Sequence, residues 1–202
     1  KCVEQKRWHD EAEVYKRRLE DYSSELEDRV RQQLRELSST HLATIFAMSK
    51  LAESRDPETG EHLERVREFA RILSDHARDS REFPELADET YRENLYNAMP
   101  LHDIGKVGIP DQILQKPGKL TVEEFEAMKR HTTIGADALR AVAGQHPGNV
   151  FVEIGIQIAE SHHERWSGSG YPRGLQGTEI PVAARIAAVA DVYDALTSKR
   201  CY

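Results

Sequence analysis

The N-terminal part of the chain alternates apolar and charged residues with the period of an α-helix. Residues 6–55 contain no glycine or proline, and most positions up to Glu36 that are not apolar are charged. Apolar residues recur every three or four positions, which predicts one long helix with a narrow apolar seam. The seam consists of Tyr15, Leu19, Tyr22, Leu26, Val30, Leu34 and Leu37.

So polar a helix cannot bury its narrow seam alone, and a partner helix is expected to cover it. Successive four-residue steps from Tyr22 to Leu34 break a strict heptad and would locally unwind a supercoil. We therefore predict that residues 1–41 form a parallel two-stranded coiled coil, which makes the protein a homodimer and links an upstream domain to residues 42–202. The alternative is an amphipathic helix that packs on its own domain.

Residues 42–202 show the wider apolar faces of helices that pack into a globular core. The end of the first helix is expected to join this core through Leu42, Ile45, Phe46, Met48, Leu51 and Ala52. Further helices are expected to begin at Pro57, at Asp88 or Thr90, at the capping-box pattern that opens with Thr121, at Val150 and at Pro181. Residues 167–177 form a glycine-rich loop. No alternating pattern of useful length predicts a strand, so the expected fold class is all-α.

Composition narrows the class of protein. The chain has 202 residues, enough for one sizeable core and an appendage. Its net charge of −7 argues against a general nucleic-acid-binding protein, which needs a basic face. Cys2 and Cys201 lie at opposite ends, which is neither a disulfide framework nor a zinc ribbon and fits a reducing, cytoplasmic compartment. No apolar run approaches the roughly 20 residues of a membrane span, and no signal peptide is visible.

The segment from Leu101 to Pro110 is the most informative for chemistry, because it places His102 beside Asp103 and follows them with Lys106. Imidazole and carboxylate ligands suit a divalent transition-metal pair better than a calcium or thiolate site. Adjacent helical residues point about 100° apart, so this His-Asp pair is suited to straddle two ions. A lysine beside two metals can neutralise a phosphate. In isolation, a core histidine with a capping aspartate is an equally good interpretation.

Further histidines and one carboxylate favour the metal interpretation. His131, His162 and His163 each adjoin an apolar helical face. Asp191 lies in a strongly apolar run, where a lone buried carboxylate is costly without a cation or hydrogen-bond donors. Asp194, one helical turn later, is a candidate to support Asp191 from outside the ligand set. Together these residues predict a metal-dependent phosphohydrolase.

Two other groups of residues carry candidate chemistry less specifically. Glu58 and His62 are four residues apart and project from one helix face, a spacing that is more often seen in solvated pairs. The glycine-rich loop lets the backbone approach a ligand and holds Tyr171 in a rigid turn, where its ring can stack on a base or its hydroxyl bind a phosphate. The alternative for this loop is a mobile surface segment. Arg173 and Arg200 are candidate anion clamps.

With these residues assembled, residues 42–202 resemble the HD-GYP family, a branch of the HD phosphohydrolase superfamily. The resemblance rests on five motifs in order: Asp56-Pro57-Glu58-Thr59-Gly60-Glu61-His62, His102-Asp103-Ile104-Gly105-Lys106, His131, His162-His163-Glu164-Arg165-Trp166-Ser167-Gly168-Ser169-Gly170-Tyr171-Pro172, and Asp191-Val192-Tyr193-Asp194-Ala195-Leu196-Thr197-Ser198-Lys199-Arg200. It implies an HD-superfamily helical bundle and hydrolysis of cyclic di-GMP, a bacterial second messenger, to linear pGpG and in some members to GMP. It also implies a centre of two or three divalent metal ions, often iron or manganese.

Carried over by position, the resemblance assigns roles to individual residues. The implied metal ligands are His102, Asp103, His131, His162, His163 and Asp191, joined by Glu58 and His62 in members that hold a third metal. Asp103 would bridge the metals, and Lys106 matches the lysine that contacts phosphate. Tyr171 and Arg200 match residues that contact the substrate.

Departures from the family leave alternatives open. Ser167 stands where the family usually has aspartate, and this difference is expected to loosen the loop or reduce activity while all candidate ligands remain. The chain is expected to be a fragment at both ends, with a phosphoreceiver or other sensor upstream and further helices after Tyr202. One alternative is a non-catalytic receptor that binds cyclic di-GMP or a GGDEF-type cyclase. Another is a phosphohydrolase that acts on other cyclic dinucleotides or nucleotides.

Overall fold

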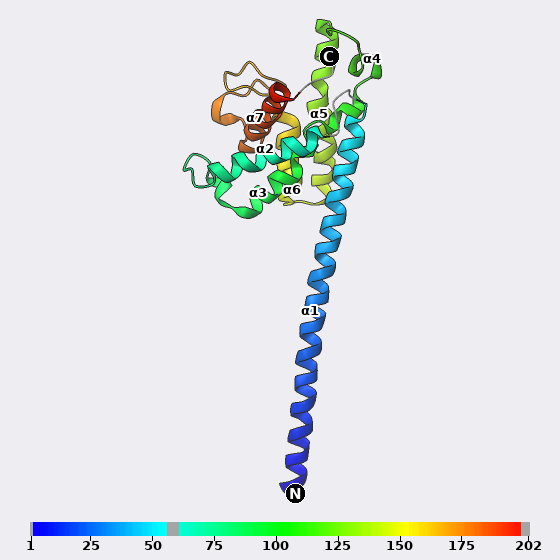
Figure 1. Cartoon of the computed structure of the whole chain (residues 1–202), viewed down its shortest axis with the longest axis vertical. Helices are drawn as coiled ribbons and strands as arrows, with labels where there is room; N and C mark the ends of the chain where they lie inside the picture. The colour runs from blue at the N-terminus through cyan, green and yellow to red at the C-terminus, as the bar shows by residue number, and fades with distance from the viewer. Residues whose placement is uncertain (1, 56–60, 199–202) are drawn as a thin grey trace. The chain divides into compact units, whose positions relative to one another are not determined.

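The computed structural model describes residues 2–55 and 61–198, with the side chains of residues 7–8 and 13–55 in the first helix. Every regular element in these residues is a helix, which confirms the predicted all-α class (Figure 1). The α-helices are α1 (Cys2–Glu53), α2 (His62–Ala77), α3 (Glu89–Ala98), α4 (Asp111–Leu114), α5 (Val122–Gln145), α6 (Val150–Ser161) and α7 (Val182–Thr197). Short 3-10 helices are η1 (Pro84–Ala87), η2 (Met99–Leu101), η3 (Ile104–Gly108) and η4 (Gly177–Glu179).

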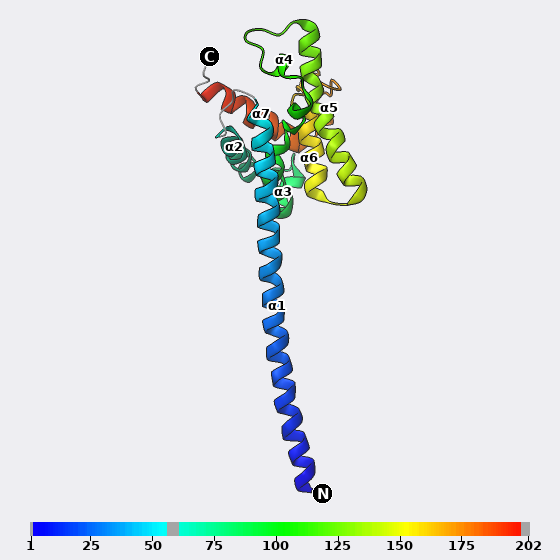
Figure 2. The same cartoon turned by 90° about the vertical axis from the view of Figure 1, so that its right-hand side faces the viewer.

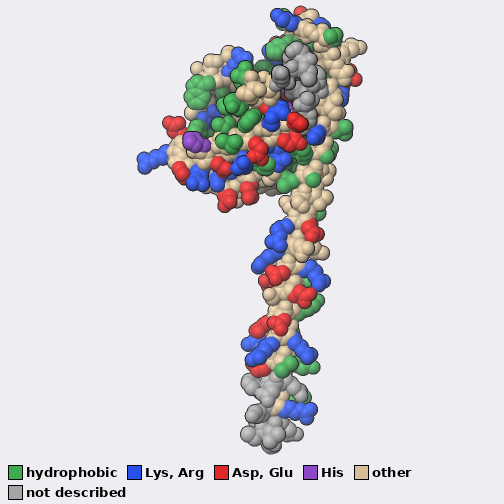
Figure 3. Space-filling model, in the orientation of Figure 1, with side chains coloured by type: hydrophobic (Ala, Val, Ile, Leu, Met, Phe, Trp, Pro, Cys, Tyr) green, Lys and Arg blue, Asp and Glu red, His purple; other side chains and the backbone are tan. Residues whose placement is uncertain are grey.

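The chain divides into two compact units, Lys1–Ile45 and Phe46–Tyr202. The first unit is a single stretch of α1, as the long Gly- and Pro-free pattern predicts. Acidic and basic side chains alternate along it (Figure 3), and some pair one turn apart, such as Glu25 with Arg29. The predicted seam residues are exposed in the single chain, Leu26 and Val30 among them. Within the described residues, no helix combines the length and hydrophobicity that a membrane span requires.

The core of the second unit lies where α2, α3, α5, α6 and α7 pack together. In both views α5 and α6 run side by side, and α2 packs on α7 and α3 (Figures 1 and 2). Large side chains with almost no exposed surface fill the space between these helices: Leu63, Leu86, Leu95, Met99, Ile154 and Ile158. Helix α6 is apolar on nearly every side because α3, α5 and α7 all cover it.

Helix starts follow the capping signals in the sequence. Asp88 accepts a hydrogen bond from the backbone N–H of Thr90 and begins α3. Thr121 and Glu124 form the predicted capping box of α5, with bonds of 3.2 and 2.7 Å. Asn149 caps α6 in the same way. The predicted helix start at Pro57 lies outside the described residues, and the described part of α2 begins at His62.

The last turns of α1 bury two polar residues. Ser49, Ala52 and Glu53 are buried, whereas Met48 and Leu51 are 61% and 70% exposed. The prediction that Met48 and Leu51 join the core is therefore wrong. Ala52 is buried and Leu42, Ile45 and Phe46 are half-buried, as predicted, so the inward face is largely apolar and carries Ser49 and Glu53 within it.

Backbone contact between η3 and α5 sets the position of the His-Asp segment. A Cβ atom added to Gly105 would overlap the carbonyl group of His131 and the backbone N of Gly135. Gly135 in turn has Gly105 as its nearest neighbour outside α5, so the two segments meet main chain to main chain. No side chain larger than hydrogen fits at Gly105 without separating them.

We predict that Gly105→Ala lowers the free energy of unfolding by at least about 2 kcal/mol, because η3 must move away from α5. Gly144→Ala is the matched control, since a Cβ at Gly144 meets no atom and alanine favours the helix by about 0.5–1 kcal/mol. Urea unfolding followed by circular dichroism measures both. Equal stability of the two variants would contradict the proposed close approach.

Candidate metal centre

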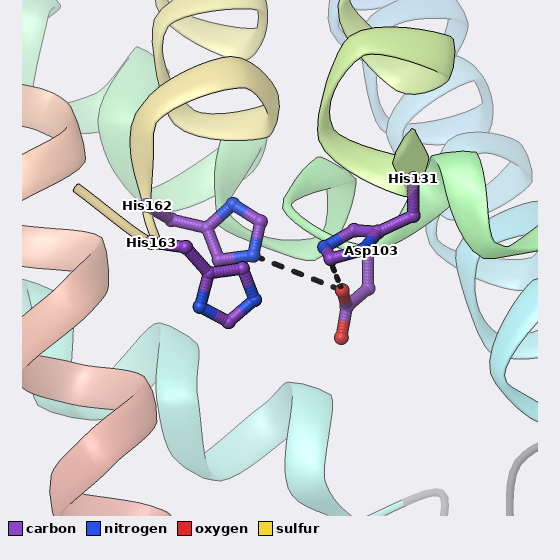
Figure 4. Close-up of side chains that lie close together, drawn as sticks. All are labelled: Asp103, His131, His162 and His163. Atoms are coloured by element: carbon purple, nitrogen blue, oxygen red, sulfur yellow. Dashed lines mark ion pairs between the residues drawn. The ribbon is translucent and has the colours of Figure 1, made fainter. Parts of the chain in front are cut away.

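Three segments bring five of the predicted ligands together. His102 follows η2 and Asp103 precedes η3, so the close contact of η3 with α5 places both beside His131 in the middle of α5. His162 and His163 directly follow the last residue of α6. Figure 4 shows the imidazoles of α5 and α6 converging on the carboxylate of Asp103.

The carboxylate of Asp103 is the common neighbour of these groups. Its Oδ1 lies 3.3 Å from His131 Nε2 and 3.8 Å from His162 Nε2. Its Oδ2 lies 3.2 Å from His102 Nε2 and 2.9 Å from Lys106 Nζ. Asp103 itself is buried. One carboxylate thus contacts both an ammonium group and several imidazole nitrogens.

Backbone carbonyls fix which nitrogen of each ring faces inward. Nδ1 of His102, His131 and His162 lies 3.0, 2.7 and 2.9 Å from the carbonyl oxygens of Met99, Met128 and Ile158, respectively. A carbonyl oxygen only accepts, so Nδ1 must carry the proton and Nε2 of the neutral ring offers its lone pair. Carbonyl bonds of this kind are the usual support of metal-binding histidines.

The inward nitrogens fit a metal ion. Nε2 of His131 and of His162 is buried and makes no hydrogen bond within the described residues. A buried polar atom without a partner is costly in a protein interior. Two groups have donor atoms that all lie within 4.8 Å of one another: Asp103, His131, His162 and His163 in one, and Glu53, His62 and His102 in the other. Their nitrogen and carboxylate donors suit divalent transition metals.

A second carboxylate orients His62. Asp194 Oδ2 accepts from His62 Nδ1 at 2.7 Å, and Asp194 also accepts from Arg65 and Ser198. Burial raises the pKa of Asp194, but these hydrogen bonds outweigh burial and lower the pKa to about 2. The carboxylate is therefore ionised and can only accept hydrogen bonds. Nδ1 of His62 therefore donates this bond, and its Nε2 lies 3.7 Å from Oδ1 of Asp191. Asp194 supports His62, whereas the sequence suggested that it supports Asp191.

Burial and charge divide the histidines into two kinds. Burial lowers the pKa of His131, of His162 and, to about 3, of His163. Burial also opposes a proton on His102, but the carboxylate of Asp103 outweighs it and raises the pKa of His102 to about 10. Burial raises the pKa of Asp103, and Lys106 together with His102 more than reverses this effect, so its pKa falls well below the usual range. Three of the rings are thus neutral and ready to bind a cation.

The predicted substrate-contacting tyrosine lies at the edge of the cluster. The ring of Tyr171 stacks on that of His163 with centroids 4.7 Å apart, and Phe125 meets it edge-on at 6.1 Å. Lys129 Nζ lies 5.5 Å from the centroid of Tyr171. Burial raises the pKa of Tyr171, so its hydroxyl stays protonated. Sequence reasoning missed Phe125 and Lys129, although they stand four residues apart on the helix that carries His131.

Buried acidic groups hold the glycine-rich loop. The carboxylate of Glu164 accepts hydrogen bonds from the backbone N–H groups of Arg173 and Leu175 at 2.7 and 3.0 Å. A Cβ at Gly170 would overlap the backbone of Glu164, so this glycine permits the close turn. These contacts do not involve the side chain of Ser167, whose hydroxyl bonds to that of Ser169. The expected effect of Ser167 on activity stays a prediction.

The remaining candidates fall elsewhere. Glu58 and Arg200 lie outside the described residues. The guanidinium of Arg173 is 2.7 Å from the buried carboxylate of Glu160, so it is engaged within the protein. An apolar pocket lies between α2, η1 and α7, and none of its lining residues within the described part of the chain is a histidine. Its lining includes Leu73, Phe83, Leu86, Trp166, Ile180 and Val189.

Comparisons with known proteins show which family the chain resembles. A family model described as HD domain matches residues 47–202. The chain is 50% identical over 168 residues to a cyclic di-GMP phosphodiesterase of Vibrio cholerae, which covers 83% of this chain and 34% of that protein. It is 46% identical over 155 residues to a cyclic di-GMP phosphodiesterase of Thermotoga maritima (77% and 39%), and 40% identical over 167 residues to 3'3'-cGAMP-specific phosphodiesterase 2 of Vibrio cholerae (83% and 30%).

The chain therefore belongs to the HD domain family, and the resemblance to its HD-GYP branch is confirmed. The chain spans about a third of the length of these curated relatives.

The neutral state of His163 predicts a pH dependence of stability in the metal-free protein. Its pKa is about 3 in the folded chain and about 6.5 in an unfolded one, so between these values the unfolded state binds more protons. Stability that is present above pH 6.5 is therefore lost as the pH falls toward 3. Replacing His163 by Gln should reduce this slope by up to about 1.4 kcal/mol per pH unit between pH 6 and 4.5.

The measurement is urea unfolding in the presence of a chelator at several pH values. Gln145→Ala, at an exposed position with no titratable side chain, gives the control and should leave the slope as it is. A His163→Gln slope equal to that of the unsubstituted chain would show that the ring is not held neutral.

Proposed function

We propose that this chain is the hydrolytic domain of a metal-dependent phosphodiesterase that cleaves cyclic di-GMP to linear pGpG and onward to GMP if the product is retained. The observation that carries the proposal is the buried convergence of Asp103 with His131, His162 and His163, in which backbone carbonyls turn the Nε2 atoms inward. Lys106 beside this carboxylate supplies a cation for a phosphate group.

The proposed ligands divide between two adjacent groups. Asp103, His131, His162 and His163 would hold one ion, and His62, His102 and Asp191 would hold a second, with Asp103 near both. Glu58 is proposed to complete a third position. Iron or manganese suits this mixture of nitrogen and oxygen donors. Divalent ions bound there would lower the pKa of a water molecule toward neutrality and offset charge on the phosphate.

The residues around the cluster would bind and orient the substrate. Lys106 Nζ lies 2.9 Å from Asp103 Oδ2, so a phosphate that enters the cluster meets an ammonium group already held in place. Tyr171, with Phe125 and Lys129 behind it, forms an aromatic and cationic wall beside His163. Such a wall suits a purine base and keeps water away from one side of the cluster. Arg200 is proposed as a further phosphate contact.

A second candidate substrate is 3'3'-cGAMP, because one relative with 40% identity carries that specificity in its name. The two cyclic dinucleotides share the ring of two phosphodiesters and differ in one purine. Metals and Lys106 would treat the phosphates alike, so the base-contacting residues must discriminate. A panel of both substrates at equal concentration separates the candidates by their kcat/KM values.

We also propose the coiled coil of residues 1–41 as the homodimer contact that joins the hydrolytic domain, residues 42–202, to a sensor. Exposed apolar side chains along α1 support this proposal, since a partner helix would cover them. A GGDEF-type cyclase is a further proposed partner.

Anaerobic hydrolysis of cyclic di-GMP, with metals counted in the same sample, tests the activity. We expect linear product from the metal-loaded chain and none from a His102→Ala, Asp103→Ala double variant. Lys106→Met should lower kcat/KM by roughly 100-fold with little change in metal content, which corresponds to about 2.7 kcal/mol of transition-state stabilisation. Lys119→Met, at an exposed lysine, is the matched control.

Hydrolysis that survives the double variant would refute the proposed site. Tight binding without turnover in a fully metallated sample would identify a receptor instead.

Charge on the seam of α1 tests the dimer. Val30→Glu places an unpaired carboxylate in the predicted interface and should raise the dimer dissociation constant at least about 100-fold, or about 2.7 kcal/mol. Gln32→Glu adds the same charge on the opposite side of the helix and should leave the dimer intact. Sedimentation equilibrium measures both, and equal dissociation constants would contradict the coiled coil.

A further inference from the structure

The end of α1 buries a carboxylate, although apolar side chains in the neighbouring positions stay exposed. Glu53 is 3% exposed, while Leu51 and Met48, on other faces of the last two turns, are largely exposed. Burying a charged group in preference to leucine and methionine reverses the usual order and is favourable only where cations or donors compensate the charge. The surroundings of Glu53 therefore need to explain its burial.

Two buried imidazoles lie beside Glu53. A carboxylate oxygen of Glu53 and one ring nitrogen each of His62 and His102 all lie within 4.8 Å of one another. The two rings meet edge to face with centroids 5.6 Å apart. All three residues are buried, and they come from α1, α2 and the end of η2.

A hydrogen bond at Nδ1 fixes the orientation of each of the two imidazoles. Asp194 holds Nδ1 of His62 at 2.7 Å, and the carbonyl oxygen of Met99 holds Nδ1 of His102 at 3.0 Å. Since Nδ1 donates in both rings, Nε2 is the atom of each ring that a metal ion would take, and on His102 the ion would replace the proton that Asp103 favours there. The fixed rings and Glu53 thus offer two nitrogens and a carboxylate from three separate elements.

We propose that Glu53 is itself a metal ligand, which binds a divalent transition-metal ion together with Nε2 of His62 and of His102. Two imidazoles and a carboxylate are a donor set that such ions favour. This proposal rests on the metal centre of the proposed function and adds to it a ligand outside the motifs that define the resemblance.

The position of Glu53 couples the site to the first helix. Glu53 is the last residue of α1, the helix whose first part forms the predicted coiled coil. A rotation or axial shift of α1 would move one ligand relative to His62 and His102, which belong to other elements. A movement of α1 would therefore change how tightly this ion is bound.

Manganese titration of the metal-free chain tests the proposal. Free Mn²⁺ is counted by electron paramagnetic resonance as the ion is added to the unsubstituted chain and to Glu53→Gln, which keeps the shape and removes the charge. We expect Glu53→Gln to bind one ion fewer per chain, or to bind one ion at least tenfold more weakly. Glu61→Gln, at a nearby exposed carboxylate, should bind the full number.

Two further variants complete the design. Glu53→Asp keeps the charge and shortens its reach, so it should retain the stoichiometry with at least tenfold weaker binding of one ion. Glu58→Gln establishes whether the affected ion is the one proposed for Glu58. Circular dichroism of the metal-free variants shows which of them fold. Full stoichiometry with unchanged affinity in any folded Glu53 variant would overturn the proposal.

The outcome is distinct from that of the activity assay. If the unsubstituted chain hydrolyses cyclic di-GMP and Glu53→Gln binds every ion normally, the proposed function stands and this ligand assignment fails. If Glu53→Gln loses an ion but the unsubstituted chain has no phosphodiesterase activity, the ligand assignment stands and the proposed function fails.

Discussion

Burying the carboxylate of Asp103 requires compensating groups on several sides, and the helices of the second unit are placed so that they supply them. Lys106 comes from the same short segment, His131 from α5, and His162 from the end of α6. The same helices form the apolar core, so the packing that excludes water also fixes the donors around the charge. Loss of this carboxylate would leave an ammonium group and several imidazoles facing one another.

The loop that would contact the substrate is joined to the His/Asp cluster through adjacent residues. His163 faces the cluster and stacks on Tyr171, while Glu164 turns away and holds the two backbone N–H groups at the far end of the loop. A displacement of one residue is therefore transmitted to the other through a single peptide unit. Binding of substrate and the position of His163 are expected to influence each other for this reason.

Much of this arrangement could be predicted from the sequence because the signals are local. Caps at Asp88 and Thr121 and the apolar periodicity located the helices, and the spacing of histidines indicated a metal site. Glu53 and Phe125 were missed because a single residue on a helix has no local sign of which face turns inward. Met48 and Leu51 were placed in the core for the same reason, since hydrophobicity ranks residues but does not reveal a buried polar cluster.

The main-chain contact of Gly105 with His131 has a consequence for how such a centre can change over evolutionary time. The separation between the His-Asp segment and α5 is determined by backbone atoms, and substitution of neighbouring side chains leaves it the same. Substitutions at individual positions could thus exchange the donor atoms, but they would not change the distance between the His-Asp segment and α5. Relatives built on this scaffold would then differ in the donor groups they present while keeping the same distance between the two segments.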